Sequence, residues 1–257
     1  MIKSFARSIL KSDVGQKMFR KFYYLSLEMD QFHPDTGEEF LELKQKCLPH
    51  TMTSVDSLYY TYRSVKHVIE NHIPGDFVEC GVWKGGNTMM VALTLMKLGD
   101  KSRKIYLYDT FEGMSEPTDK DISYKQEDAD GEWKTSQKNG YNEWCYSPLD
   151  EVKNNLKSTG YPEEKIVFVK GKVEDTIPGV IPENIAILRL DTDWYESTYH
   201  ELIHLYPLLS KNGFLIIDDY GYWQGAREAV DKYFAENGID IFMNRLDNSA
   251  RGGIKLN

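Results

Sequence analysis

The chain has 257 residues, of which 41% are hydrophobic and 28% charged, so one domain with a sizeable buried core is expected. A formal net charge of -9 argues against a general electrostatic grip on nucleic acid. Three cysteines without CxxC spacing exclude a disulfide framework and give no thiolate zinc signature, which favours a cytoplasmic location. No transmembrane segment and no signal peptide are expected, because no apolar run is long enough for either.

Residues 1–50 are expected to be mainly helical and to form an N-terminal cap on a single domain spanning 1–257. The first 22 residues combine basic side chains with apolar ones at roughly helical spacing. We expect this helix to dock on the body of the protein or on a second subunit, which would make the chain a homo-oligomer. A peripheral contact with a membrane is the alternative.

After residue 75, short apolar segments alternate with helical patterns. Parallel strands are expected at 76–80, 104–109, 165–170, 185–191 and 213–218, and antiparallel edge strands at 239–247 and 252–256. Such alternation is typical of a mostly parallel sheet with helices on both faces, so the fold class is α/β. Residues 113–145 are long, polar and irregular, and we expect them to form a lid-like insertion.

The first of these strands runs into a glycine-rich turn, Glu79-x-Gly81-x-x-x-Gly85-Gly86. Ligands of open α/β sheets bind outside the carboxyl ends of the strands, and glycines allow the backbone to approach a ligand closely. An acid at the end of the second strand, Asp109, stands where the two hydroxyls of a ribose would be held. The turn therefore predicts a nucleotide-containing ligand.

The glycine spacing departs from the G-x-G-x-x-G pattern of dinucleotide sites. A carboxylate at Glu79 would repel a diphosphate, whereas it suits the amino group and the sulfonium of S-adenosylmethionine. We therefore predict an S-adenosylmethionine site, with Glu174 and Asp175 near the adenine edge after the third strand. The alternative is that Glu79 and Asp109 are plain carboxylates at strand ends.

Three further acids follow the fourth and fifth strands, namely Asp191, Asp218 and Asp219. Carboxylates crowded at one rim of a sheet repel one another, so such a cluster usually holds a hard divalent cation or keeps a proton. Oxygen ligands favour magnesium, manganese or calcium over zinc. A cation would lower the pKa of an alcohol for attack on a methyl group, and vicinal diols could chelate it. Capping of the following helices is the alternative role for one or two of these acids.

Five stretches resemble the macrocin O-methyltransferase family: HTMTSVDSLYY, PGDFVECGVWKGGNT, YLYDTFEGM, LRLDTDWYEST and GFLIIDDYGYWQGAREAV. The resemblance covers residues 50 to 235 and implies a class I methyltransferase fold, S-adenosylmethionine, Mg²⁺ and a sugar hydroxyl as acceptor. It also implies that Glu79, Gly81 and Asp109 bind the cofactor and that Asp191, Asp218 and Asp219 bind the metal. By the same resemblance, Thr51 and Met52 lie near the cofactor and the acceptor.

The metal pattern is also similar to that of catechol O-methyltransferases, with one departure. Those enzymes carry a basic lysine three positions after the first metal aspartate, where this chain has Trp194. The general base is therefore open between Asp191, which we favour, Asp193 and His50. Trp194 itself either stacks on a sugar or packs in the core. A phenolic acceptor and a non-catalytic S-adenosylmethionine-binding module are the alternative functions.

Overall fold

The computed structural model describes residues 35–256. The chain divides into two units, Met1–Leu41 and Glu42–Asn257, and the second contains the whole sheet. The helix expected in the first 22 residues, and with it most of the 1–50 cap, lies outside the described residues. The described end of that cap consists of helix α3 (Gly37–Cys47) and a short 3-10 turn (Leu48–His50).

The second unit alternates helices and strands as the sequence predicts. Ser54 caps α4, because its side chain accepts a hydrogen bond from the Ser57 N–H, and Gly99 ends α5 in a left-handed conformation. The strands are β1 (Asp76–Cys80), β2 (Ile105–Asp109), β3 (Ile166–Lys170), β4 (Ile185–Leu190), β5 (Leu209–Ile217), β6 (Asn244–Arg245) and β7 (Arg251–Ile254). The helices are α4 (Val55–Glu70), α5 (Gly86–Leu98), α6 (Ala129–Thr135), α7 (Leu149–Lys157), α8 (Val173–Thr176), α9 (Tyr195–Leu205) and α10 (Gln224–Asn237).

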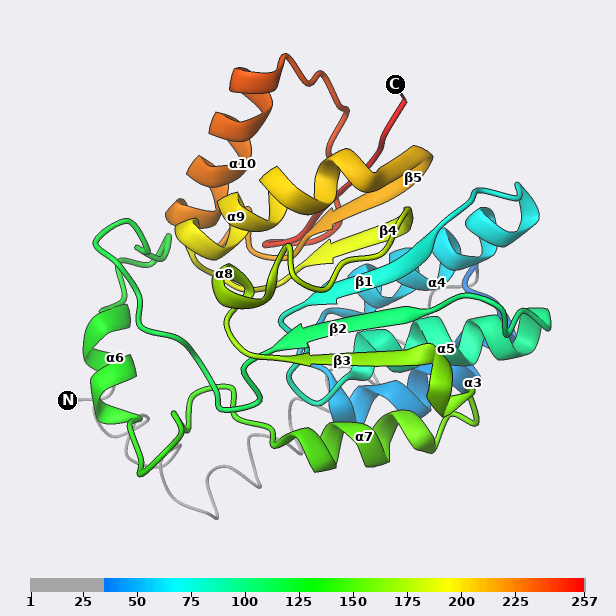
Figure 1. Cartoon of the computed structure of the whole chain (residues 1–257), viewed down its shortest axis with the longest axis horizontal. Helices are drawn as coiled ribbons and strands as arrows, with labels where there is room; N and C mark the ends of the chain where they lie inside the picture. The colour runs from blue at the N-terminus through cyan, green and yellow to red at the C-terminus, as the bar shows by residue number, and fades with distance from the viewer. Residues whose placement is uncertain (1–34, 257) are drawn as a thin grey trace. The chain divides into compact units, whose positions relative to one another are not determined.

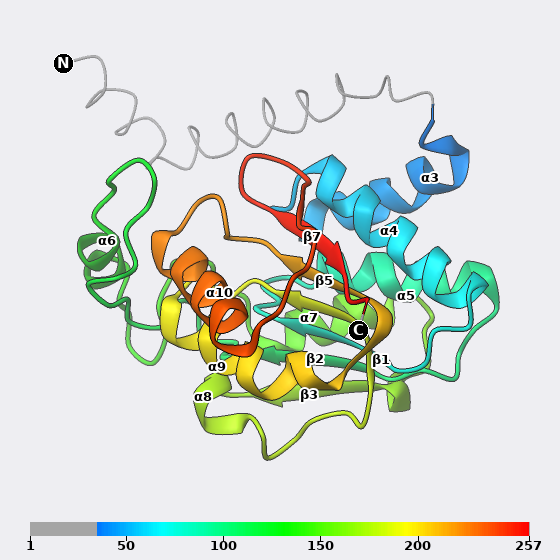
Figure 2. The ribbon, with the colours of Figure 1, turned by 90° about the horizontal axis from the view of Figure 1, so that it is seen from above.

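The seven strands form one sheet in the order β3-β2-β1-β4-β5-β7-β6. Figure 1 shows the order from β3 to β5, and Figure 2 shows β7. Strands β1 to β5 are parallel, and β7 pairs antiparallel with both β5 and β6. The chain moves outward from β1 to β3 and then returns to place β4 on the other side of β1. This reversal of strand order opens a crevice at the carboxyl ends of β1 and β4, where ligands of such sheets bind.

Helices cover both faces of the sheet, as Figures 1 and 2 show. Helices α4, α5 and α7 pack on one another over one face, and α8, α9 and α10 over the other. Alternation along β1 sends Val78 and Cys80 into the apolar core shared with α9 and α10. Phe77 and Glu79 therefore point to the opposite face, which α4 and α5 cover.

Two expectations need correction. The first edge strand is only Asn244–Arg245, not 239–247, because its partner β7 is short and pairs with it at two positions. The irregular stretch 113–145 contains a seven-residue helix, α6, which begins where Asp128 accepts a hydrogen bond from the Gly131 N–H. That stretch is also tied down by side chains: Trp133 donates to the Met114 carbonyl and Trp194 to the Ser115 carbonyl, both at 3.0 Å. Its action as a lid stays a prediction.

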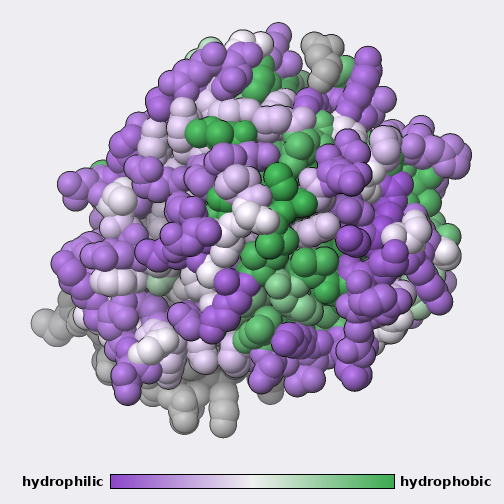
Figure 3. All heavy atoms as spheres, viewed as in Figure 1, coloured by the Kyte–Doolittle hydropathy of each residue, from purple (hydrophilic) through white to green (hydrophobic). Residues whose placement is uncertain are grey.

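The surface turned toward the viewer in Figure 1 is mainly hydrophilic at its margins, with a band of apolar side chains across its middle (Figure 3). Within residues 35–256, no helix combines the length and the apolarity needed to cross a membrane.

Candidate active site

The carboxyl ends of β1, β2 and β4 open onto a pocket. Gly81, Asp109 and Glu174 line it, as predicted for cofactor residues, and so do Asp191 and Asp193. The pocket thus joins the expected cofactor side of the rim to the expected metal side. Asp175, Gly85, Glu79, Thr51 and Met52 are not among its lining residues.

Gly81 lets two backbone segments meet at the floor of this pocket. Its φ is +78°, and a Cβ atom there would lie 1.9 Å from the carbonyl oxygen of Asp191. Its N–H donates to the Tyr108 carbonyl at 2.9 Å, which fixes the turn against β2. Gly85 has a different role: it begins α5 with φ +85°, and a Cβ there would meet the Leu156 side chain. Both glycines are therefore required by local packing.

Asp109 holds the glycine turn in place. Its Oδ2 accepts the N–H groups of Val82 and Trp83 at 2.7 and 3.1 Å, and its Oδ1 accepts that of Phe111 at 2.7 Å. Burial raises the pKa of the carboxyl, while these N–H groups lower it. Because a carboxylate oxygen has two lone pairs, Oδ1 can still accept a hydroxyl from a ligand in the pocket.

Glu79 lies near the end of β1 and takes part in a buried ion pair. Its carboxylate is buried beside α5. There, Oε1 accepts a hydrogen bond from Nε of Arg189 at 3.1 Å, and Oε2 accepts one from the hydroxyl of Thr88. Burial raises its pKa, and the Arg189 guanidinium opposes that shift. These contacts are with Arg189 and Thr88, and Glu79 is not among the residues that line the pocket. Its contact with the cofactor stays a prediction.

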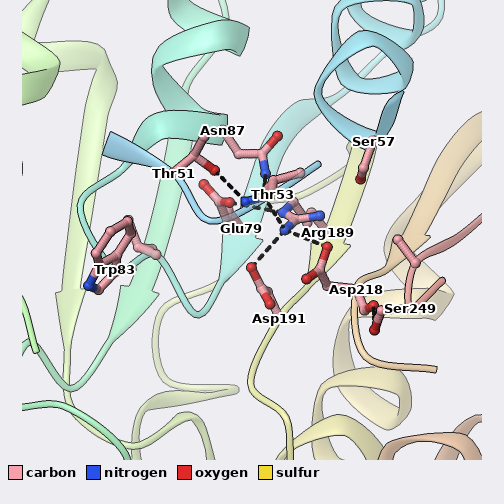
Figure 4. Close-up of polar contacts among 12 residues, drawn as sticks. Thr51, Thr53, Ser57, Glu79, Trp83, Asn87, Arg189, Asp191, Asp218 and Ser249 are labelled. Carbon is pink, nitrogen blue, oxygen red and sulfur yellow. Dashed lines mark hydrogen bonds and ion pairs between the residues drawn. The ribbon is translucent and has the colours of Figure 1, made fainter. Parts of the chain in front are cut away.

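The sequence analysis did not single out Arg189, which lies at the centre of the site (Figure 4). This residue of β4 is 3% exposed, and its Nη2 donates to Oδ2 of Asp191 at 2.7 Å and to Oδ1 of Asp218 at 2.8 Å. The same atom donates to Thr53 at 3.2 Å, which anchors the HTMTS segment to the sheet. One buried cation therefore links Glu79 to two of the three predicted metal ligands.

The structure brings Asp191, Asp218 and Asp219 together as expected. One carboxylate oxygen from each lies within 4.8 Å of the others, and Oδ2 of Asp219 is buried without a hydrogen-bond partner among the described residues. Burial and mutual repulsion raise the pKa values of Asp191 and Asp219 well above the ordinary range. An all-oxygen cluster with an unpartnered buried oxygen fits a hard divalent cation.

Of the candidate bases, Asp193 lies beside this cluster. It adopts φ +66°, lines the pocket, and accepts the indole N–H of Trp223 at 2.7 Å. Burial, followed by repulsion from Asp191, raises its pKa to about 8.

His50 and its neighbours lie at the start of α5. A Cβ on Gly86 would come within 2.6 Å of the His50 carbonyl and the Thr51 side chain, so this segment packs closely on the helix. Burial lowers the pKa of His50, and the charges that act on it come from Lys84 and Glu151. Its Nδ1 is buried and has no partner within the described chain. Met52 is 55% exposed.

Trp194 packs in a cluster of aromatic side chains and is 3% exposed. Its ring meets those of Trp223 and Trp144 edge to face, with centroids 4.9 and 5.7 Å away. Packing, the alternative in the sequence analysis, therefore describes its position.

Known proteins that are similar in sequence to this chain are O-methyltransferases. The family model described as macrocin-O-methyltransferase (TylF) matches residues 10–251. The chain is 32% identical over 239 residues to the 8-demethyl-8-(2,3-dimethoxy-alpha-L-rhamnosyl)-tetracenomycin-C 4'-O-methyltransferase of Streptomyces olivaceus, covering 91% of this chain and 88% of the relative. It is 33% identical to the mycinamicin III 3''-O-methyltransferase of Micromonospora griseorubida, with 83% and 79% covered.

Among solved structures, the O-methyltransferase NovP is similar with a TM-score of 0.70 and 29% identity, over 81% of this chain and 83% of that chain. The mostly parallel sheet with its antiparallel edge is thus the class I methyltransferase fold. The chain belongs to the macrocin O-methyltransferase (TylF) family, and it is an S-adenosylmethionine-dependent O-methyltransferase.

Proposed function

We propose that the enzyme transfers the methyl group of S-adenosylmethionine to a sugar hydroxyl with the help of Mg²⁺. The observation that carries this proposal is the cluster of Asp191, Asp218 and Asp219 beside the pocket that Gly81 and Asp109 line. Two relatives, named as methyltransferases of a rhamnosyl-tetracenomycin and of mycinamicin III, support a sugar as the acceptor.

The three acids would hold the cation through the oxygens that converge within 4.8 Å, including the unpartnered Oδ2 of Asp219. A bound divalent cation supplies Lewis acidity, which lowers the pKa of a hydroxyl. Arg189 supports this arrangement because it holds one oxygen of Asp191 and one of Asp218, and so fixes both carboxylates.

We assign the general base to Asp193 in place of Asp191, the residue favoured from the sequence. Asp191 already accepts a hydrogen bond from Arg189 and belongs to the acid cluster, whereas Asp193 lines the pocket next to that cluster and accepts the Trp223 indole N–H. A general base must lie close to the proton that it removes, and Asp193 lines the pocket two residues after Asp191. Asp193 would take the proton of the hydroxyl at a carboxylate oxygen.

The cofactor side rests on the residues that meet at the glycine turn. Asp109 would accept a ribose hydroxyl at Oδ1, and Gly81 would let the methionine part approach the backbone. Glu174 lines the far end of the pocket, where an adenine edge is expected. Cytoplasmic location and assembly as a homo-oligomer remain part of the proposal, the former supported by the sparse cysteines.

Isothermal titration with S-adenosylmethionine and with Mg²⁺ tests the two sites separately. Wild type should bind both, Asp218→Asn should bind only the cofactor, and Asp150→Asn on the exposed face of α7 should match wild type. Formation of S-adenosylhomocysteine should require a sugar acceptor and stop with chelator. Unchanged Mg²⁺ affinity in Asp218→Asn would refute the metal site, and turnover with catechol but no sugar would refute the acceptor class.

A further inference from the structure

Three arginines gather at the edge of the sheet beside the acid cluster. Arg245 and Arg251 stand directly opposite each other in the β6–β7 pair, and Arg227 lies in the first turn of α10. Like charges in directly opposed positions destabilise a strand pair, and this pair is at the sheet edge of a chain with net charge -9. A bound anion would relieve this repulsion.

Within residues 35–256, none of the three guanidinium groups lies within 4.0 Å of a carboxylate oxygen. The nearest acids are used elsewhere: Asp247 accepts the Ser54 hydroxyl and the N–H groups of Ser249 and Ala250, and Asp231 accepts the Tyr220 hydroxyl.

Backbone carbonyls and one tyrosine ring hold these side chains in place. Arg227 donates through Nε to the Tyr220 carbonyl at 3.0 Å, Arg245 through Nε to the Asp247 carbonyl at 2.9 Å, and Arg251 through Nη1 to the Ala250 carbonyl at 2.8 Å. Arg227 and Arg251 each lie 5.6 Å from the centroid of the Tyr220 ring. Each guanidinium keeps further N–H donors for a ligand, and a fixed fork of donors suits phosphate oxygens.

The arginines adjoin the site where the acceptor would be methylated. Tyr220 follows Asp219 directly, and Arg251 pairs with Ile217, the residue before Asp218. In the turn that joins β6 to β7, the Ser249 hydroxyl donates to the Asp218 carbonyl at 2.6 Å, and Figure 4 shows Ser249 next to Asp218. The turn that carries Ser249 therefore links the strand of Arg251 to the backbone of Asp218.

We propose that Arg227, Arg245 and Arg251 bind the diphosphate of a nucleotide-linked sugar, whose sugar hydroxyl then lies at the acid cluster. This inference rests on the proposed sugar acceptor and narrows it to an activated, phosphate-bearing sugar. It separates this enzyme from relatives named for tetracenomycin and mycinamicin acceptors. The enzyme that supplies the acceptor would be one that makes or modifies nucleotide sugars, and a glycosyltransferase would consume the product.

Titration with uridine diphosphate and thymidine diphosphate tests the arginines when it is performed in EDTA, because no cation can then carry the diphosphate to the acids. Wild type should bind at least one of them, and Arg227→Gln, Arg245→Gln and Arg251→Gln should each weaken binding roughly tenfold or more. Arg63→Gln, on the exposed side of α4, is the matched control and should bind like wild type. Melting curves verify that each variant is folded.

The proposal would be overturned if wild type bound neither nucleoside diphosphate. It would also be overturned if a variant that combines Arg227→Gln, Arg245→Gln and Arg251→Gln bound them as tightly as wild type. Inorganic phosphate that binds as tightly as the nucleoside diphosphates would overturn the nucleotide assignment. If wild type fails in this titration but methylates a neutral glycoside with Mg²⁺, the arginine site is refuted while the proposed function stands. If the arginines bind the nucleotide but no sugar is methylated, the proposed function is refuted while the arginine site stands.

Discussion

Replacing Arg189 by methionine should unfold the enzyme at a much lower temperature. The change removes the one guanidinium that donates to Glu79, Asp191 and Asp218, and leaves those carboxylates facing one another with little access to water. Loss of one partner from a buried ionic group costs roughly 3–5 kcal/mol of the free energy of unfolding. At about 2–4 °C per kcal/mol for a domain of this size, Tm should fall by about 6–20 °C.

Thermal melts at pH 8 in EDTA measure this effect without a divalent cation. Arg189→Lys keeps a positive charge but cannot reach Glu79 and both aspartates at once, so its Tm should lie between those of Arg189→Met and wild type. Added Mg²⁺ should raise the Tm of Arg189→Met more than that of wild type, because the cation would replace the missing charge beside Asp191 and Asp218. Arg63→Met, an exposed substitution on α4, is the control for losing an arginine.

A Tm for Arg189→Met within about 2 °C of wild type would show that the network contributes little to folding, since that shift corresponds to roughly 1 kcal/mol. Equal stabilisation of both proteins by Mg²⁺ would separate Arg189 from the metal site. Either result would contradict the role assigned here to this residue.

Three further predictions concern single groups of the site and the core. Gly81→Ala forces a Cβ to 1.9 Å from the Asp191 carbonyl oxygen, so melting temperature and titrated S-adenosylmethionine affinity should both fall. Asp109→Asn replaces an acceptor oxygen of the glycine turn, so cofactor affinity in the same titration should fall on the order of tenfold. Burial raises the pKa of Glu201 well above its ordinary value, so its stabilising contribution is complete below the unfolded pKa and is lost as pH rises toward the folded one. Glu201→Gln should therefore melt increasingly above wild type from pH 5 to pH 9, and parallel curves would refute this.

Much of the fold could be predicted from the sequence, because apolar runs and glycine turns report local structure directly. The strands before Gly81 and Asp191 agree with the structure to within a residue or two. The edge strand expected at 239–247 was wrong in length, since strand pairing depends on a partner distant in sequence, and β7 pairs with only two of its residues.

The acid cluster was predictable for a related reason. Parallel strands end at the same edge of a sheet, so acids that follow two neighbouring strands must meet there. The chemical environment of each acid was not predictable, because it depends on side chains from other elements. Trp223, for example, reaches Asp193 from a position 30 residues later in the chain.

The ion pair of Glu79 with Arg189 follows from strand geometry. Glu79 lies two residues before Gly81, and Arg189 lies two residues before Asp191, so equal distances from the strand ends place them side by side when β1 and β4 are neighbours. Side chains alternate along a strand, so both must point to the face that α4 and α5 cover. A single arginine within the apolar run IAILRL requires a buried acid on that face, and Glu79 is the one that matches in register. Read together, the pair would have predicted both the β1–β4 adjacency and the ion pair behind the acid cluster.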